Sequence, residues 1–147
     1  MTVTTTAPKA SAGAPASSIA GKTTLSIIVA VSVCHLINDI MQSMLMAIYP
    51  LLKENYNLDY VQIGLLTFTF QVTASLLQPA IGIYTDKRPL PYSLPIGMGS
   101  SLVGLIVLGF SSSYWMLLLG SALVGLGSAI FHPESSRVAR LASGGRH

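Results

Sequence analysis

Four long apolar stretches limit what this chain can fold into more than any other feature of its sequence. A helix that crosses the hydrocarbon core of a bilayer needs about 20 mostly apolar residues. The stretches run from about Leu25 to Pro50, Val61 to Tyr84, Tyr92 to Phe110 and Tyr114 to Phe131. The sequence therefore predicts an all-α integral membrane protein with four transmembrane helices.

Composition supports this class and excludes several others. Only 9% of the 147 residues are charged, against about 25% in an ordinary soluble domain. The eight Lys and Arg residues are scattered along the chain, so no basic stripe indicates a nucleic-acid partner. The single cysteine, Cys34, excludes a disulfide framework. The sequence shows no nucleophile–base pair or phosphate-binding glycine loop, so we expect neither an enzyme nor a cofactor.

The distribution of positive charge predicts the orientation of the helices. Residues 1–22 consist mainly of Thr, Ala, Ser, Pro and Gly, a composition typical of a disordered tail. Basic residues accumulate in the cytoplasmic loops of membrane proteins. If the amino terminus is cytoplasmic, seven basic residues lie inside and only Lys53 lies outside. We therefore expect residues 1–22 to form a cytoplasmic tail.

The segment after the fourth stretch, residues 132–147, is polar. Pro133 suits the first turn of a new helix and Gly144–Gly145 suits its end. We therefore expect a cytoplasmic loop with a short amphipathic helix. His132, at the end of the fourth apolar stretch, is interpreted as a boundary residue and not as a ligand.

One face of the first stretch carries polar side chains near the middle of the membrane. His35, Asn38, Asp39 and Gln42 fall within an arc of roughly 100° on a helix. A charged group at that depth costs on the order of 3 kcal/mol, so it faces a helix bundle or a water-filled cavity. His35 and Asp39 lie one turn apart and can pair. They are candidates for proton coupling or for a structural polar contact between helices. We expect no metal site, because two ligands of mixed type have no third ligand nearby.

Amide side chains on two helices are candidates for a substrate cavity. Gln71 lies near the middle of the second stretch, and Asn38 and Gln42 share the polar face of the first. Amides bind polar ligands, but they also join membrane helices to one another. Both interpretations of these three residues remain open.

Small residues recur at a spacing of four in the third and fourth stretches. Such spacing lets the backbones of membrane helices approach closely, and we interpret these faces as packing surfaces. The residues are Ser93, Gly97, Ser101 and Gly109 in the third stretch, and Ser121, Gly125 and Ala129 in the fourth.

The loop after the second stretch carries a motif. Its sequence, Gly82-Ile83-Tyr84-Thr85-Asp86-Lys87-Arg88, resembles the Gly-x-x-x-Asp-Arg/Lys loop signature of the major facilitator superfamily. Two longer phrases, Tyr84–Pro89 and Phe131–Arg140, are similar to the fosmidomycin resistance branch of that superfamily. The resemblance extends from about Leu25 to the end of the chain. It implies a conformational role for Gly82, Asp86, Lys87 and Arg88, in which the acid stabilises one conformer.

This resemblance implies a drug exporter of the bacterial inner membrane that exchanges protons for a small anionic substrate of the fosmidomycin type. Members of the superfamily have about twelve helices in two halves built from inverted repeats. Four helices correspond to the first part of that fold. We therefore expect an amino-terminal fragment, whose partners are the lipid bilayer and the remaining carboxy-terminal helices of the same carrier.

Two other functions fit four helices. One is a stand-alone small multidrug exporter that works as a dimer. The other is a non-transporting membrane scaffold, which would use the small-residue faces to bind its partners. The tail, the Asp86 loop and the segment from His132 to Arg140 favour the major facilitator interpretation.

Overall fold

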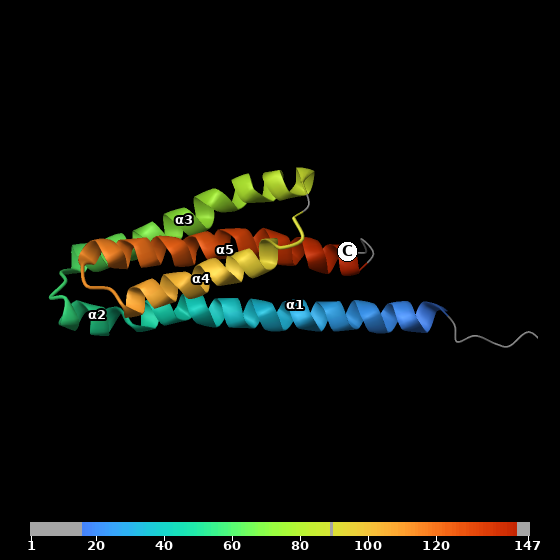
Figure 1. Ribbon diagram of the computed structural model, residues 1–147, viewed down its shortest axis with the longest axis horizontal. Coiled ribbons are helices and arrows are strands. Elements are labelled where there is room, and N and C mark those ends of the chain that lie inside the picture. The colour runs from blue at the N-terminus through green and yellow to red at the C-terminus, as the bar shows by residue number, and fades with distance from the viewer. Residues whose placement is uncertain (1–15, 89, 144–147) are drawn as a thin grey trace, which may run out of the picture.

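The computed structural model describes residues 16–88 and 90–143, and every regular element in these ranges is a helix. Figure 1 shows the helices lying roughly side by side along the long axis of the molecule. The predicted all-α class is confirmed. The five helices are α1 (Ala16–Ala47), α2 (Tyr49–Asn55), α3 (Tyr60–Lys87), α4 (Ser93–Gly109) and α5 (Tyr114–Ala142).

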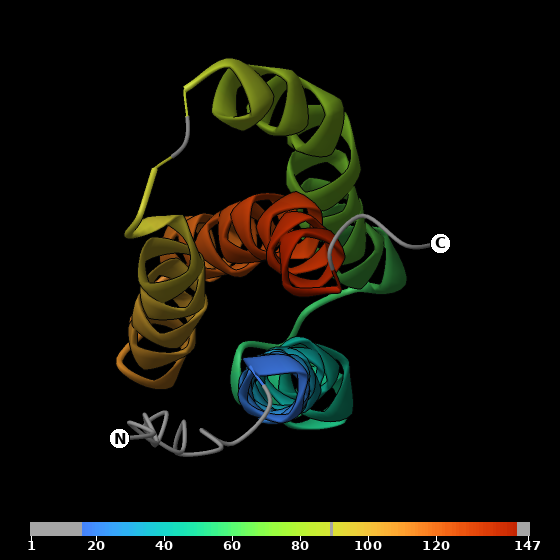
Figure 2. The ribbon, with the colours of Figure 1, turned by 90° about the vertical axis from the view of Figure 1, so that its right-hand side faces the viewer.

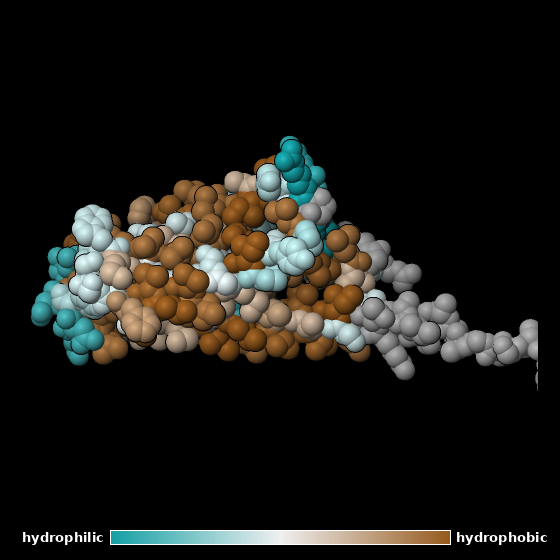
Figure 3. Space-filling model, in the orientation of Figure 1, coloured by the Kyte–Doolittle hydropathy of each residue, from teal (hydrophilic) through white to brown (hydrophobic). Residues whose placement is uncertain are grey.

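The lengths and surfaces of the helices fit a multi-pass membrane protein. Three segments are long and apolar enough to cross a bilayer: Thr24–Asn55, α3 and α5. The apolar helix α4 has 17 residues, which gives about 26 Å at 1.5 Å per residue and places it at the lower limit for a span. Figure 3 shows a largely hydrophobic surface along the middle of the molecule, with hydrophilic residues near its ends.

Helix α5 is the centre of the bundle. It packs against α3, α4 and α1, and Figure 2 shows it between the other helices when the bundle is viewed from its end. Among the described residues, α1 and α3 make no extensive contact with each other. The two helices are therefore held apart by α5, which leaves room between them.

Glycines allow α5 to approach its neighbours closely. A methyl group added at Gly127 would lie 2.6 Å from the carbonyl oxygen of Gly97 in α4, and one added at Gly125 would lie 2.6 Å from that of Phe70 in α3. Such distances are too short for a carbon atom, so only glycine fits. The predicted packing role of the small residues is confirmed for these helices, with one exception. Gly109 has nothing within 4 Å of an added methyl group, and Gly104 lies against α5 instead.

The first helix begins earlier and ends sooner than the sequence predicted. Residues 16–22, expected to belong to a disordered tail, lie in α1, and the rest of that expected tail (residues 1–15) falls outside the described residues. The predicted span to Pro50 is divided into α1 and α2. Pro50 lies in the first turn of α2, where the missing N–H of proline does no harm.

The predicted end of the fourth span at Phe131 is wrong, and the expected separate amphipathic helix does not form. Helix α5 runs without interruption through Pro133 to Ala142. Two polar residues beyond Phe131, Glu134 and Ser135, are buried inside the bundle. The side chain of Glu134, only 1% exposed, accepts hydrogen bonds from Ser93 Oγ at 2.6 Å and Arg137 Nη2 at 2.7 Å. Helix packing thus overrides the local stop signal of the proline.

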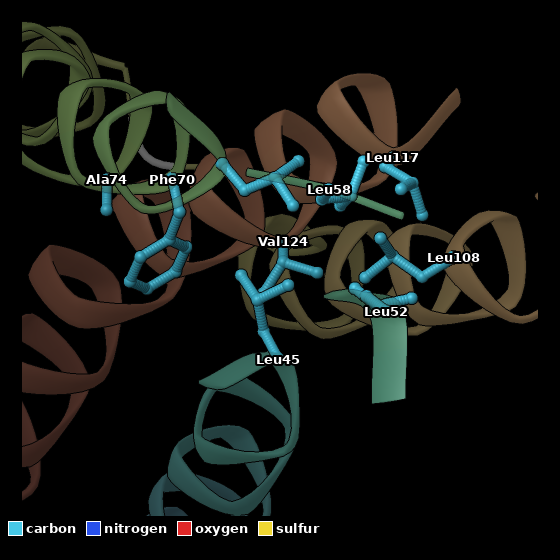
Figure 4. Close-up of a cluster of buried hydrophobic side chains, with 9 residues drawn as sticks. Leu45, Leu52, Leu58, Phe70, Ala74, Leu108, Leu117 and Val124 are labelled. Carbon is cyan, nitrogen blue, oxygen red and sulfur yellow. The ribbon is translucent and has the colours of Figure 1, made fainter. Parts of the chain in front are cut away.

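An apolar cluster closes the end of the bundle where α2 lies, and Figure 4 shows its side chains converging from several helices. Two hydrogen bonds join the loops at the same end: Tyr56 Oη donates to the Ser111 carbonyl oxygen at 2.5 Å, and Tyr114 Oη donates to that of Gln62 at 2.9 Å. The cluster comprises Leu45, Leu52, Leu58, Leu66, Phe70, Ala74, Leu108, Leu117 and Val124.

The contact between α4 and α5 gives a direct test of the packing. In a Gly104→Ala variant the added methyl carbon would lie 2.8 Å from the Gly120 carbonyl oxygen, so we expect a loss of about 1–3 kcal/mol in stability. Gly99→Ala is the matched control, because nothing lies within 4 Å of its added carbon. Detergent-induced unfolding, followed by circular dichroism in micelles, measures both variants. Equal stability of the two would contradict the close approach.

Candidate functional site

A polar cavity of about 520 Å³ lies between α1 and α3, with α5 behind it. This is the space that the separation of α1 and α3 leaves open. Phe70 and Ala74, at the edge of the apolar cluster, form part of its wall, so the cavity begins where the cluster ends. Its lining consists of Asp39, Gln42, Ser43, Met46, Phe70, Gln71, Ala74, Ser75, Gln78, Ser128 and His132.

A second hollow of about 620 Å³ continues the cavity toward the loop between α3 and α4. It shares Gln78 and His132 with the first and extends to Asp86. The two hollows together form a furrow that leads away from the apolar cluster. Figure 1 shows the second half of α3 diverging from α5 along this stretch. Pro79 lies in this half of the helix.

Three ionisable side chains meet beside the cavity, and two of them, Asp39 and His132, line it. Asp39 Oδ2 lies 3.5 Å from His35 Nε2, and Asp39 Oδ1 lies 3.9 Å from His132 Nε2. The two imidazole rings are in edge contact, with centroids 5.0 Å apart. The side chains are 40% (His35), 50% (Asp39) and 30% (His132) exposed. We call these three residues the His–Asp–His cluster.

The hydrogen bond of the His132 ring determines what its other nitrogen can do. Nδ1 lies 2.9 Å from the carbonyl oxygen of Ser128 and 3.3 Å from its Oγ, and the carbonyl contact is a hydrogen bond in the tautomer whose Nδ1 carries the proton. In the neutral ring, Nε2 then presents a lone pair toward the carboxylate of Asp39. A lone pair and a carboxylate oxygen 3.9 Å apart repel each other weakly, and a cation placed between them would contact both.

The structure brings some of the predicted residues to one place and separates others. His35 and Asp39 pair as their spacing predicted, and Gln42 and Gln71 line the cavity from opposite sides. Asn38 does not line it. Its side chain is 0% exposed and accepts a hydrogen bond from Ser101 Oγ of α4 at 3.5 Å. The expected place of Asn38 in the cavity is wrong, because α1 turns this residue toward α4.

Sequence reasoning missed the role of His132. It was interpreted as a boundary residue, and the structure places it in the cavity beside Asp39. His132 also supplies a third potential metal ligand beside His35 and Asp39, which the sequence did not predict. One signal was available: Ser128, His132 and Ser135 follow helical spacing across Pro133, which indicates that the helix continues.

The residues of the loop motif lie at the end of the furrow. Gly82 and Asp86 line both the second hollow and a smaller one of about 310 Å³, which Arg137 and Arg140 also line. Lys87 is the last residue of α3, and Arg88 follows it with its backbone N–H donating to the Tyr84 carbonyl oxygen. The side chains of Asp86, Lys87 and Arg88 are exposed.

Comparison with known proteins now identifies the family. The sequence pattern of the Major Facilitator Superfamily matches residues 31–147. The chain belongs to the major facilitator superfamily. The fosmidomycin resistance protein of Escherichia coli (strain K12) is 54% identical over 140 residues, which cover 95% of this chain and 34% of that protein.

Two further relatives also match. An uncharacterised MFS-type transporter of Bacillus subtilis (strain 168), YfnC, is 43% identical over 124 residues, covering 84% of this chain and 30% of its own length. The bacillibactin exporter of the same organism is 28% identical over 107 residues, which cover 69% of this chain and 27% of that protein. No solved structure matches the chain significantly. The chain thus spans about a third of the length of these relatives.

The wall of the cavity can be tested by thiol labelling in membranes. In a Cys34→Ser background, we expect Gln71→Cys to react with a hydrophilic thiol reagent, because water in the cavity allows the reactive thiolate to form. Asn38→Cys should not react, since this position is buried. Leu76→Cys on α3 is the matched control: its position is 70% exposed but outside the cavity lining, so lipid should cover it. Equal labelling at positions 38 and 71 would contradict the placement of Asn38.

Proposed function

We propose that this chain supplies the first helices of a proton-driven exporter for small anionic compounds of the fosmidomycin type. The observation that carries the proposal is Asp39, an ionisable group in the middle of an apolar helix that opens onto a polar cavity. An intramembrane acid is expensive to insert and marks ion or proton pathways. The 54% identity to the fosmidomycin resistance protein supports this substrate class.

In the proposed mechanism Asp39 and His35 carry the coupled proton. Their side chains lie 3.5 Å apart, close enough for one to stabilise the charge of the other. An exchanger must hold substrate and proton alternately, so the acceptor of the proton must lie on the wall of the substrate cavity. Asp39 meets that requirement.

Gln42 and Gln71 are proposed to bind the substrate. They face the cavity from α1 and α3, and their amide N–H groups can donate hydrogen bonds to an anionic head group. Amides do not titrate, so this contact persists whichever protonation state Asp39 adopts. Asn38 is proposed to act indirectly, because its buried side chain accepts a hydrogen bond from Ser101 Oγ at 3.5 Å and so helps to hold α1, which carries Gln42, against α4.

The whole carrier requires more than this chain, and its remaining helices are proposed as the partner that completes the cavity. Membership of the superfamily favours this arrangement over a stand-alone small multidrug exporter or a scaffold. Many carriers of this kind work by moving two halves about a central site. The cavity between α1 and α3 would form one wall of that site.

The proton role is tested in a chimera in which this chain replaces the matching third of the E. coli fosmidomycin resistance protein. We expect Asp39→Asn to abolish gradient-dependent fosmidomycin resistance, because the amide cannot carry the proton. Asp59→Asn is the matched control. Asp59 caps α3 by accepting from the Gln62 N–H at 2.7 Å, a role that asparagine fills equally well. Full resistance of the Asp39→Asn chimera at equal expression would refute the proton role.

Asp86, with Gly82, Lys87 and Arg88, is proposed to stabilise one conformer of the carrier. We expect Asp86→Ala in the chimera to lower the maximal rate of export more than the apparent affinity for substrate, since Asp86 lies at the end of the furrow and outside the main cavity. Asp86→Glu keeps the charge and should retain most of the rate. Initial rates over a range of substrate concentrations separate the two effects. An unchanged maximal rate for Asp86→Ala would remove the conformational role.

The protein is proposed to reside in the bacterial inner membrane with its amino terminus in the cytoplasm. Labelling of intact cells with a membrane-impermeant thiol reagent tests this orientation in the Cys34→Ser background. Glu54→Cys at the end of α2 should react from outside, and Leu90→Cys between α3 and α4 only after permeabilisation. Both positions are exposed, so a difference in labelling reports sidedness. The reverse pattern would invert the topology.

A further inference from the structure

We infer that the His–Asp–His cluster is a binding site for a divalent transition-metal ion, such as Zn²⁺ or Co²⁺. The cluster offers one ligand atom from each of three side chains, and all three atoms lie within 4.8 Å of one another. This inference does not depend on the proposed transport function, because it concerns only what the three side chains can bind.

The distances in the cluster are close to those of a metal site. Zn²⁺ binds imidazole nitrogen and carboxylate oxygen at about 2.0–2.2 Å, so neighbouring ligands of a tetrahedral site lie about 3.3–3.5 Å apart. The two distances from Asp39 to His35 and His132 are 3.5 and 3.9 Å. All three side chains are partly exposed, so small rotations suffice to bring the ligand atoms together around an ion.

The surroundings prepare His132 for the role of a ligand. Its Nδ1–H donates to the Ser128 carbonyl oxygen at 2.9 Å. Histidine ligands commonly make such a bond through the nitrogen that does not face the metal, because it fixes the tautomer and the ring orientation. The lone pair of Nε2 is thereby aimed at the position beside Asp39. An ion there would also remove the repulsion between that lone pair and the carboxylate.

The ligand set determines the class of ion. Imidazole nitrogen suits Zn²⁺, Cu²⁺, Fe²⁺ and Ni²⁺, whereas Mg²⁺ and Ca²⁺ prefer sites made only of oxygen. Three protein ligands leave a coordination position open, as in catalytic zinc sites. Asp39 and His132 line the 520 Å³ cavity, so the open position can be reached by water or by an anionic ligand within it.

The cluster is assembled by two helices. His35 and Asp39 lie one turn apart on α1, and His132 lies on α5. The ring of His35 also lies against Phe131 of α5, with centroids 5.6 Å apart, which limits its movement. Binding of an ion would therefore link α1 to α5 across the wall of the cavity.

The experiment uses the 147-residue chain purified in detergent through an affinity tag that contains neither histidine nor cysteine. The probe is Co²⁺ alone, followed by its visible absorption, with Zn²⁺ as a competitor. We expect one Co²⁺ per chain, displaced by Zn²⁺. His35→Ala, Asp39→Asn and His132→Ala should each weaken binding by more than about tenfold, since even the outer-shell partners of metal ligands contribute about 10–100-fold to affinity.

The sequence provides matched controls. The chain contains three histidines and one cysteine, so His147→Ala and Cys34→Ser remove the other residues that commonly bind these ions, and both should leave affinity unchanged. His132→Cys should keep binding and add a thiolate-to-cobalt charge-transfer band, a signal that an unfolded or merely rearranged protein would not give. Far-UV circular dichroism verifies that each variant keeps the helix content of the parent chain.

The outcomes distinguish the alternatives. Absence of Co²⁺ binding by the parent chain, or equal binding by His132→Ala at unchanged helix content, would overturn the inference. Loss of binding in His147→Ala or Cys34→Ser would also overturn it, because it would place the ion elsewhere. None of these measurements involves transport, so failure of the proposed export function would not affect them.

Discussion

The close approach of α5 to its neighbours is the contact on which the rest of the structure depends. Glycines at 120 and 127 meet α4 on one side, and Gly125 meets α3 on another. In a membrane, where lipid is as apolar as the side chains, such van der Waals contact replaces the hydrophobic effect as the force that joins helices. Because α5 fills the centre, α1 and α3 cannot meet across it, and the polar cavity occupies the space between them.

The cavity explains how an acid is tolerated in the middle of α1. An ionised side chain facing lipid would cost several kcal/mol, whereas one in a hydrated furrow beside two imidazoles retains partners. The apolar cluster and the Tyr56 and Tyr114 hydrogen bonds close one end of the furrow, while the other end opens toward Asp86. In the described residues the cavity therefore continues toward the α3–α4 loop.

The sequence predicted the elements well because apolar length and small-residue spacing are local signals. It also predicted the His35–Asp39 pair, since one turn of helix fixes that geometry. Prediction from the sequence failed where contacts between helices determine the structure. Pro133 suggested a break, but the buried Glu134 and its hydrogen bonds to Ser93 and Arg137 hold the helix together. Asn38 was expected in the cavity, although an arc of 100° on α1 is wide enough to face both α3 and α4.

The sequence predicted neither the observed end of α5 nor the His–Asp–His cluster, and both errors have the same cause. If the helix stopped at Phe131, His132 would begin a loop and its ring would have no fixed position. Once the helix continues, Ser128 lies one turn before His132 and its carbonyl oxygen orients the ring. The lone pair of Nε2 then faces the carboxylate of Asp39 at 3.9 Å, so a cation between these two acceptors would contact both. The proposed proton coupling and the inferred metal binding both rest on that single arrangement, so an ion bound at this position would occupy the atoms that the coupled proton requires.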